Sequence, residues 1–276
     1  MTFPRARWAR STLVGGLATA LATLTFVAPA HAVILPGTSN DLKPMPGTAS
    51  GALPYSAVVE IDLGPGYTLD GKILGRCTGW MYASNMVATA GHCIYDETKV
   101  TGGYKISQMT VTPGINGTYK PFQTCGVVNA YVPPEWTQGQ SRTQEGNPYW
   151  DYGALKLNCT VGDKTGLLKY GAAPNVGWPT RVVGYPHRSA DPALYPDHSQ
   201  WYSDDQVRAF NGYQVFYAND TEQRMSGAPV MQWDGYRNEW NVVAIHHGGA
   251  DDPNYNVGTR IAPIVVSDLQ YWQNYG

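Results

Sequence analysis

The 276-residue chain is poor in charge and in motifs that bind metals. Only 14% of its residues are charged, and after residue 32 no apolar stretch is long enough to span a bilayer. Neither C-x-x-C nor H-E-x-x-H occurs, so a zinc site has no support and we expect no metal or other cofactor. The balance of 19 basic and 21 acidic side chains argues against nucleic acid or anionic lipid as the partner.

The first 32 residues have the pattern of a secretory signal peptide. Three arginines precede the run STLVGGLATALATLTFVA, and Ala30 and Ala32 place small residues where a signal peptidase cleaves. A membrane anchor is the alternative, but the apolar core is short for a bilayer span. Cleavage after Ala32 leaves 244 residues that begin at Val33, with 16 basic and 21 acidic side chains. We therefore expect a secreted protein that is not attached to a membrane. We also expect a monomer, because nothing in the sequence indicates an oligomer.

Four cysteines in an exported chain favour disulfides over metal binding. Four cysteines allow three pairings. We choose Cys77–Cys93 and Cys125–Cys159, because the first pair would close a short loop across neighbouring strands.

The rest of the chain has a β composition, with 31 glycines, 20 prolines and many short apolar runs between turn signals. The runs occupy residues 56–63, 71–82, 85–91, 106–114, 125–133, 152–158, 181–186, 213–218, 228–233 and 240–249. About ten to twelve strands without alternating helices predict an all-β barrel or sandwich. One helix is expected at residues 263–275, with Ile264, Leu269 and Trp272 on one face.

Two segments lack any strand or helix period. Residues 33–54 are rich in Pro, Gly and Ser and predict an extended N-terminal arm. Residues 133–151, PPEWTQGQSRTQEGNPYWD, form the longest turn-rich interior stretch, which could join two halves of similar size.

Three residues have local contexts that suit nucleophilic catalysis. His92 ends the apolar strand of VATAGHC, Asp151 precedes the alternating strand of YWDYGALKL, and Ser226 lies in the turn of RMSGAPV. A serine hydroxyl needs a base such as imidazole, and the base works better when a carboxylate fixes its tautomer. Each residue alone has a structural explanation, but the order His, Asp, Ser is one of the known orders of a catalytic triad.

These motifs resemble those of the chymotrypsin-like serine proteases, and within them the bacterial glutamyl endopeptidases of the staphylococcal type. TAGHC is similar to the histidine signature, and DYGALKL, VVGYP and SGAPV are similar to segments around the aspartate, in the second barrel and around the serine. The resemblance covers residues 33–276 as one protease domain. It implies two packed six-stranded antiparallel β-barrels, at about 55–135 and about 152–262, connected through residues 133–150. His92 would be the general base, Asp151 its orienting partner and Ser226 the nucleophile.

The resemblance also places an unusual residue in the oxyanion hole. The backbone N–H groups of Ser226 and of the residue two before it would bind the oxyanion. In the family the latter is usually glycine, which adopts positive φ freely, and here it is Arg224. A non-glycine residue at positive φ costs about 1–2 kcal/mol, and losing one oxyanion donor lowers the rate about a hundredfold to a thousandfold.

Three further residues match the family's recognition of a glutamate side chain. The resemblance maps a pocket histidine onto His246 in VVAIHHGG and a pocket threonine onto Thr221, and strand alternation turns His247 the other way. The start VILP resembles the family's mature terminus, so the Val33 amine would also reach the substrate carboxylate. We expect both the amine and the His246 imidazole to be at least partly charged near neutral pH. His187 and His198 are assigned to solvated surface.

The resulting interpretation is a secreted serine endopeptidase that acts on protein or peptide substrates, cleaving after Glu or Asp. Two alternatives stay open. Arg224 could have disabled the oxyanion hole and left a binding protein on a protease scaffold, since fold alone does not establish activity. The pocket could also favour a residue other than an acidic one.

Overall fold

A computed structural model of the chain describes residues 41–64, 68–69, 72–73, 75–95, 106–137, 147–187 and 193–276. The predicted signal peptide and Val33 lie outside these residues. In the described part, no helix has the length and apolar character needed to cross a membrane.

Six antiparallel strands close the first barrel in the order β2-β5-β6-β9-β8-β7. Their bounds are β2 Val58–Asp62, β5 Arg76–Ala83, β6 Met86–Thr89, β7 Thr110–Pro113, β8 Cys125–Tyr131 and β9 Gly153–Leu157. Trp80 and Leu155 are fully buried in its core.

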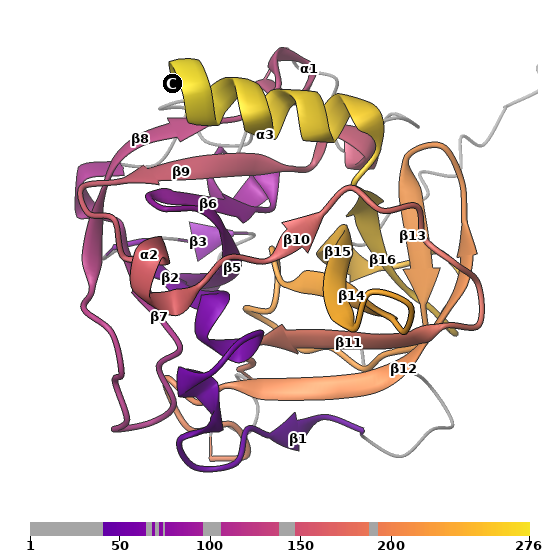
Figure 1. Cartoon of the computed structure of the whole chain (residues 1–276), viewed down its shortest axis with the longest axis horizontal. Coiled ribbons are helices and arrows are strands. Elements are labelled where there is room, and N and C mark those ends of the chain that lie inside the picture. Colours follow the sequence, from indigo (N-terminus) through magenta and orange to yellow (C-terminus); the bar gives the residue numbers. More distant parts are fainter. Residues whose placement is uncertain are drawn as a thin grey trace, which may run out of the picture.

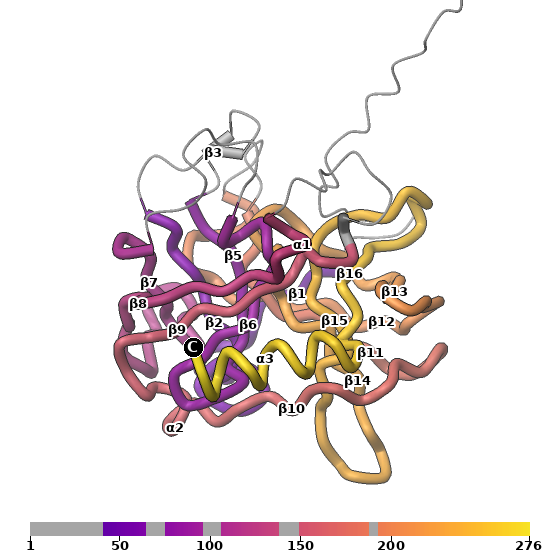
Figure 2. The backbone as a smooth tube through the Cα atoms, turned by 90° about the horizontal axis from the view of Figure 1, so that it is seen from above, coloured from indigo at the N-terminus to yellow at the C-terminus, as the bar shows by residue number. Residues whose placement is uncertain are grey.

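The second barrel follows the order β12-β11-β14-β15-β16-β13 and closes through pairing of β12 with β13. Its strands are β11 Pro179–Gly184, β12 Trp201–Phe210, β13 Gln214–Tyr217, β14 Pro229–Asp234, β15 Glu239–Gly249 and β16 Asn256–Arg260. Two short strands extend this sheet: β1 (Lys43–Pro44) pairs with β12, and β10 (Lys169–Tyr170) runs parallel to β15. The barrels lie side by side, indigo to magenta and orange to yellow in Figures 1 and 2.

The remaining elements are short. They are β3 (Thr68–Leu69) paired with β4 (Lys72–Ile73), the 3-10 turns η1 (Ala49–Gly51), η2 (Tyr55–Ala57), η3 (Gly91–Cys93), η4 (Ile106–Gln108) and η5 (Asn147–Trp150), and the single-turn helices α1 (Pro134–Thr137) and α2 (Gly162–Thr165).

The two-barrel fold with a C-terminal helix is confirmed, but the expected boundary between the barrels is wrong. β9 pairs with β6 and β8 and closes the first barrel, so residues 153–157 do not begin the second. The turn-rich stretch at 133–150 accordingly lies between two strands of the first barrel, and the connection runs from the end of β9 to β11. A strand next to a long loop looks the same in sequence whichever barrel it enters.

The C-terminal helix α3 spans Pro263–Tyr275 and packs back onto the first barrel, across β9 in Figure 1. Its buried residues are Val265, Leu269 and Trp272. Ile264, expected on that face, is 47% exposed. It lies about 140° around the helix axis from Leu269, whereas the spacing 265, 269, 272 follows one stripe. Trp272 stacks on Tyr131 of β8.

Candidate active site

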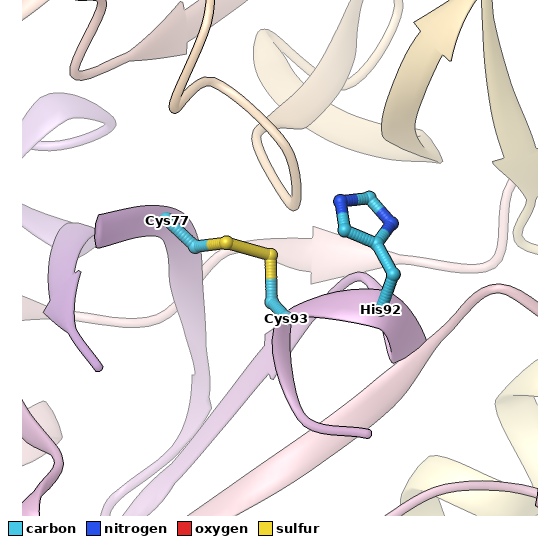
Figure 3. A group of neighbouring side chains, drawn as sticks. All are labelled: Cys77, His92 and Cys93. Carbon is cyan, nitrogen blue, oxygen red and sulfur yellow. A yellow bond between two sulfur atoms is a disulfide. The ribbon is translucent and has the colours of Figure 1, made fainter. Parts of the chain in front are cut away.

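His92 lies on the short turn η3, immediately after strand β6 of the first barrel. The next residue, Cys93, forms a disulfide with Cys77 at the start of β5, and this bond fixes the turn to the neighbouring strand. Figure 3 shows the His92 ring and the disulfide projecting from this region. A second disulfide joins Cys125 and Cys159. Both are the pairs that we chose from the sequence. His92 is 7% exposed, so its orientation is set by packing as well as by the turn.

Asp151 holds the His92 ring in one orientation through two contacts. It lies between η5 and β9, where Oδ2 is 2.8 Å from Nδ1 of His92 and Oδ1 accepts the His92 backbone N–H at 2.8 Å. Thr259 of the second barrel donates to the Asp151 carbonyl at 3.1 Å. An ionised carboxylate only accepts hydrogen bonds, so Nδ1 carries the proton and Nε2 presents its lone pair.

The carboxyl of Asp151 is strongly biased toward the ionised form. Burial by itself raises its pKa, but the charge of His92 and the hydrogen bonds from His92 outweigh burial and lower the pKa of Asp151 to about 2. At neutral pH the buried His92–Asp151 pair therefore contains a carboxylate whose partner is the imidazole.

The Ser226 turn is pressed against the first barrel beside His92. The Ser226 carbonyl accepts the Thr78 N–H at 2.9 Å and lies 3.7 Å from the sulfur of Cys93. Gly227 has φ 87°, and a Cβ there would lie 2.1 Å from both the Thr78 carbonyl and the Thr89 hydroxyl. Only glycine permits this approach. The structure thus places Ser226 against Cys93, the residue next to His92.

Arg224 has φ 69°, in the left-handed region. This agrees with the expectation from the sequence, since the family usually has glycine at this position. Its carbonyl accepts the Thr78 hydroxyl at 3.0 Å, and the preceding carbonyl, of Gln223, accepts the His187 N–H at 2.9 Å. Because the C=O and N–H of a trans peptide point in opposite directions, the Arg224 N–H faces away from His187. Within the described residues, no backbone hydrogen bond uses the N–H of Arg224 or of Ser226.

Thr221 and His246 are fully buried in the second barrel. His246 Nδ1 lies 2.5 Å from the hydroxyl of Tyr217. Burial raises the pKa of Tyr217 well above its usual range, so this hydroxyl is the donor and His246 carries its proton on Nε2. Neither His246 Nε2 nor Thr221 Oγ1 has a hydrogen-bond partner among the described residues. Two buried groups able to donate are thus left without an acceptor.

The expectation that His246 is partly charged is not supported. Burial, and then the charges of His247 and His92, lower the pKa of His246 to about 3. His246 is therefore a neutral donor near neutral pH.

His247 does not follow simple strand alternation. It is the extra residue of a β-bulge, because His246 pairs with Gly258 and Gly248 with Val257. It is 7% exposed. Burial lowers the pKa of His247 to about 4, against the opposing charge of Asp151.

Because the pKa values of His246 and His247 are low, we expect the unfolding free energy to fall in mild acid. Their folded pKa values lie below the ordinary 6.5, so below pH 6.5 the unfolded chain binds protons that the native state refuses, and stability falls with pH. Between pH 7 and pH 5 each histidine should cost about 2 kcal/mol of unfolding free energy. Urea unfolding at both pH values measures this. The fall should be about 2 kcal/mol smaller in His247→Gln, and an equal fall in both proteins would contradict the assignment.

Several residues around this site had no sequence signal. Tyr217 lies in a recognised strand run, but nothing in the sequence links it to His246. His198, expected at the solvated surface, has a side chain that is 40% exposed, but its Nδ1 also lies 2.6 Å from Glu60 Oε2. The neighbouring Asp197 contacts Arg224. Val33 lies outside the described residues. The first described residue, Asp41, donates its backbone N–H to Asp220, the neighbour of Thr221.

One group of residue types that can bind metals occurs among the described residues, Cys77, His92 and Cys93. The two sulfur atoms are joined to each other, so neither is available as a thiolate.

Residues 48–267 match the family described as Trypsin. The chain belongs to the trypsin family. It is a chymotrypsin-like serine protease with two β-barrels, and the His92–Asp151 pair lies where β6 of the first barrel ends and β9 begins.

Two curated relatives are similar over most of this protease. A glutamyl endopeptidase of Bacillus licheniformis is 32% identical over 82% of this chain and 66% of its own length. An extracellular metalloprotease of Bacillus subtilis is 31% identical over 81% of this chain and 65% of its own length. The chain thus spans about two thirds of each relative. A solved Glu endopeptidase in complex with MPD has a TM-score of 0.70 at 20% identity, over 87% of this chain and 99% of that one, which supports the fold.

Proposed function

We propose that this protease is secreted and cleaves peptide bonds after glutamate through an acyl-enzyme on Ser226. The observation that carries the proposal is the buried His92–Asp151 pair, with Nδ1 and Oδ2 2.8 Å apart, next to the turn that bears Ser226. Residues 1–32, the two disulfides and a relative named as extracellular support export.

In this mechanism the Ser226 hydroxyl attacks the substrate carbonyl carbon while Nε2 of His92 takes its proton. The carbonyl oxygen becomes an oxyanion, which the N–H groups of Arg224 and Ser226 stabilise. The C–N bond then breaks, and His92 gives the proton to the departing amine. Water attacks the remaining ester in the same way, with His92 again as base, and the acid is released. Asp151 stabilises the imidazolium that forms in both halves.

Specificity for glutamate follows from the chemistry of Thr221, His246 and Val33. A carboxylate loses several kcal/mol of hydration on burial unless donors replace the water. The buried Thr221 hydroxyl and the His246 Nε2–H are two such donors without an acceptor among the described residues. Since His246 is neutral, the positive charge would have to come from the Val33 amine. Asp41 anchors the arm beside Thr221, and the eight residues from Val33 are long enough to bring the amine to the pocket.

Two forms of the N-terminus test the substrate class. Peptides that differ only in Glu, Gln or Lys before the cleaved bond are given to the chain that starts at Val33 and to the same chain with an added Met before Val33. A hydrogen bond to a charged group contributes about 1.5–3 kcal/mol, so Glu should exceed Gln by at least about tenfold in kcat/KM, and the added Met should remove most of that preference.

Cleavage of the Gln peptide is the internal control, because its amide has the size of the glutamate side chain without its charge. It should proceed equally with both N-termini. Equal preference for Glu in the two forms would remove Val33 from the pocket. Faster cleavage after Lys or Gln than after Glu would show a serine protease of another specificity.

A further inference from the structure

A single carboxylate oxygen joins two arginines near the Ser226 turn. Oδ1 of Asp197 lies 3.0 Å from Nη1 of Arg76 and 3.4 Å from Nη1 of Arg224. Arg76 is the first residue of β5 in the first barrel, and Arg224 belongs to the loop between β13 and β14 of the second. Asp197 precedes β12, so three segments distant in the sequence meet at one oxygen.

The Asp197 segment is itself fixed to the first barrel. The next residue, His198, contacts the buried Glu60 of β2 through its ring, and its carbonyl accepts the Gly117 N–H at 3.0 Å. Glu60 also lies 3.8 Å from Arg76. His198 has φ 63°, an uncommon conformation that these contacts hold in place. Asp197 is therefore presented to Arg224 from an anchored backbone.

The backbone conformation of Arg224 is strained and depends on contacts that hold it in place. At φ 69° a residue with a Cβ is strained, and the chain would relax if φ became negative. Such a change would turn the Arg224 N–H away from its present direction. The side chain of Arg224 is 16% exposed and that of Asp197 is 62% exposed, so the ion pair lies at the surface with the guanidinium on its more buried side.

The ion pair also cancels a repulsion. The two guanidinium groups contact the same oxygen of Asp197, so they lie close together. In keeping with this, burial and then the charge of Arg76 lower the pKa of Arg224. Without Asp197 they would repel each other, and Arg224 is the one on a strained loop. The carboxylate thus stabilises the strained conformation both directly and by screening Arg76.

We propose that Asp197 is a positioning residue for catalysis: through the guanidinium of Arg224 it holds the Arg224 backbone N–H in the oxyanion hole. The ion pairs of Asp197 with Arg76 and Arg224 thus stabilise at residue 224 the positive φ that a glycine would adopt without strain. This inference rests on the proposed function, since it assigns the oxyanion to that N–H. Because the oxyanion develops only as the reaction proceeds, loss of Asp197 should lower kcat and leave KM nearly constant.

The test is a double-mutant cycle between Asp197→Asn and Arg224→Gly. In the native background Asp197→Asn should lower kcat about fivefold, with KM within about twofold, because the carboxylate is lost while the strain remains. In the Arg224→Gly background the same change should alter kcat by less than about twofold, because glycine adopts positive φ without a tether. Asp205→Asn, which removes another surface ion pair, with Arg208, is the matched control and should leave kcat unchanged.

Arg224→Ala separates strain from charge. Alanine keeps the strain and loses the tether, so its kcat should fall below that of Asp197→Asn, whereas Arg224→Gly keeps the backbone N–H, removes the strain and should exceed the native rate. A salt series on the unmutated chain provides a measurement that needs no folded Asp197 variant. Raising the ionic strength from about 0.05 M to about 0.5 M should lower its kcat, and Arg224→Gly should not respond.

The outcomes are distinct. Equal falls on Asp197→Asn in both backgrounds, or no fall in either, would overturn the positioning role while leaving the protease intact. A folded native chain without turnover on any peptide would overturn the proposed function and this inference with it.

Discussion

Replacing Ser226 by alanine should abolish turnover, lowering kcat by about a millionfold. Nucleophile, base and orienting carboxylate act as a unit, so removing the hydroxyl costs as much as removing the whole set. The Ser226 carbonyl and the Gly227 N–H, which hold the turn, are backbone groups and are kept by alanine. The thermal midpoint should therefore stay close to that of the native protein, and peptide hydrolysis at saturating substrate measures the loss.

The matched control is Ser107→Ala, which removes an exposed hydroxyl from η4 of the first barrel. Its kcat should equal the native value. If Ser226→Ala kept a tenth or more of native turnover while remaining folded, Ser226 would not be the nucleophile, and the catalytic proposal would have to be abandoned.

Asp151→Asn should lower kcat by about ten thousandfold with little change in KM. An amide can present an N–H to Nδ1 of His92, which favours the tautomer with its proton on Nε2 and removes the base from the serine. It also removes the negative charge that stabilises the imidazolium. The low pKa of Asp151, about 2, means that the native group stays ionised throughout the working range, so protonation does not produce this defect above about pH 4.

Kinetics at pH 7 on the two folded proteins check this prediction. Circular dichroism and the thermal midpoint report whether the buried pair tolerates the amide. A loss below about tenfold would indicate that the carboxylate at 2.8 Å from Nδ1 has a structural role in place of a catalytic one.

Much of the site could be predicted from the sequence because catalysis requires particular residue types beside particular turns. TAGHC indicates His92 through its likeness to the family's histidine signature, and the Cys77–Cys93 disulfide was predicted from the short loop that it closes across neighbouring strands. The positive φ of Arg224 was anticipated for the same reason, since the geometry of the turn is shared and only the side chain differs.

Other features depend on contacts that sequence patterns do not encode. β12 was absent from the predicted strands because its sequence, WYSDDQVRAF, contains four consecutive polar residues and so lacks apolar alternation. β16 was missed because its five residues, NVGTR, include few β-formers although most are buried. The Asp197–Arg76 and Asp197–Arg224 pairs join positions separated by 121 and 27 residues, with no local motif at any of them.

The charge state of His246 is another property that the sequence could not predict. A histidine in a strand can be recognised from the sequence, but its pKa depends on burial and on two neighbouring imidazoles, and its tautomer on the Tyr217 hydroxyl. Those surroundings make it neutral, so in the proposed pocket the positive charge would have to come from the Val33 amine. The sequence predicted a strand at this position, and the structure confirms it as β15, but only the structure indicates the protonation state of His246.

The reactivity of one hydroxyl decides the whole account. The folded chain beginning at Val33 is incubated with a phosphonate that carries a glutamate-like side chain, and the modified residue is mapped by mass spectrometry, with Ser226→Ala as the blank. We expect one adduct per chain, on Ser226, at a rate that falls by orders of magnitude in Asp151→Asn. A folded protein that stays unmodified at Ser226, or that is modified at another serine, would contradict the account.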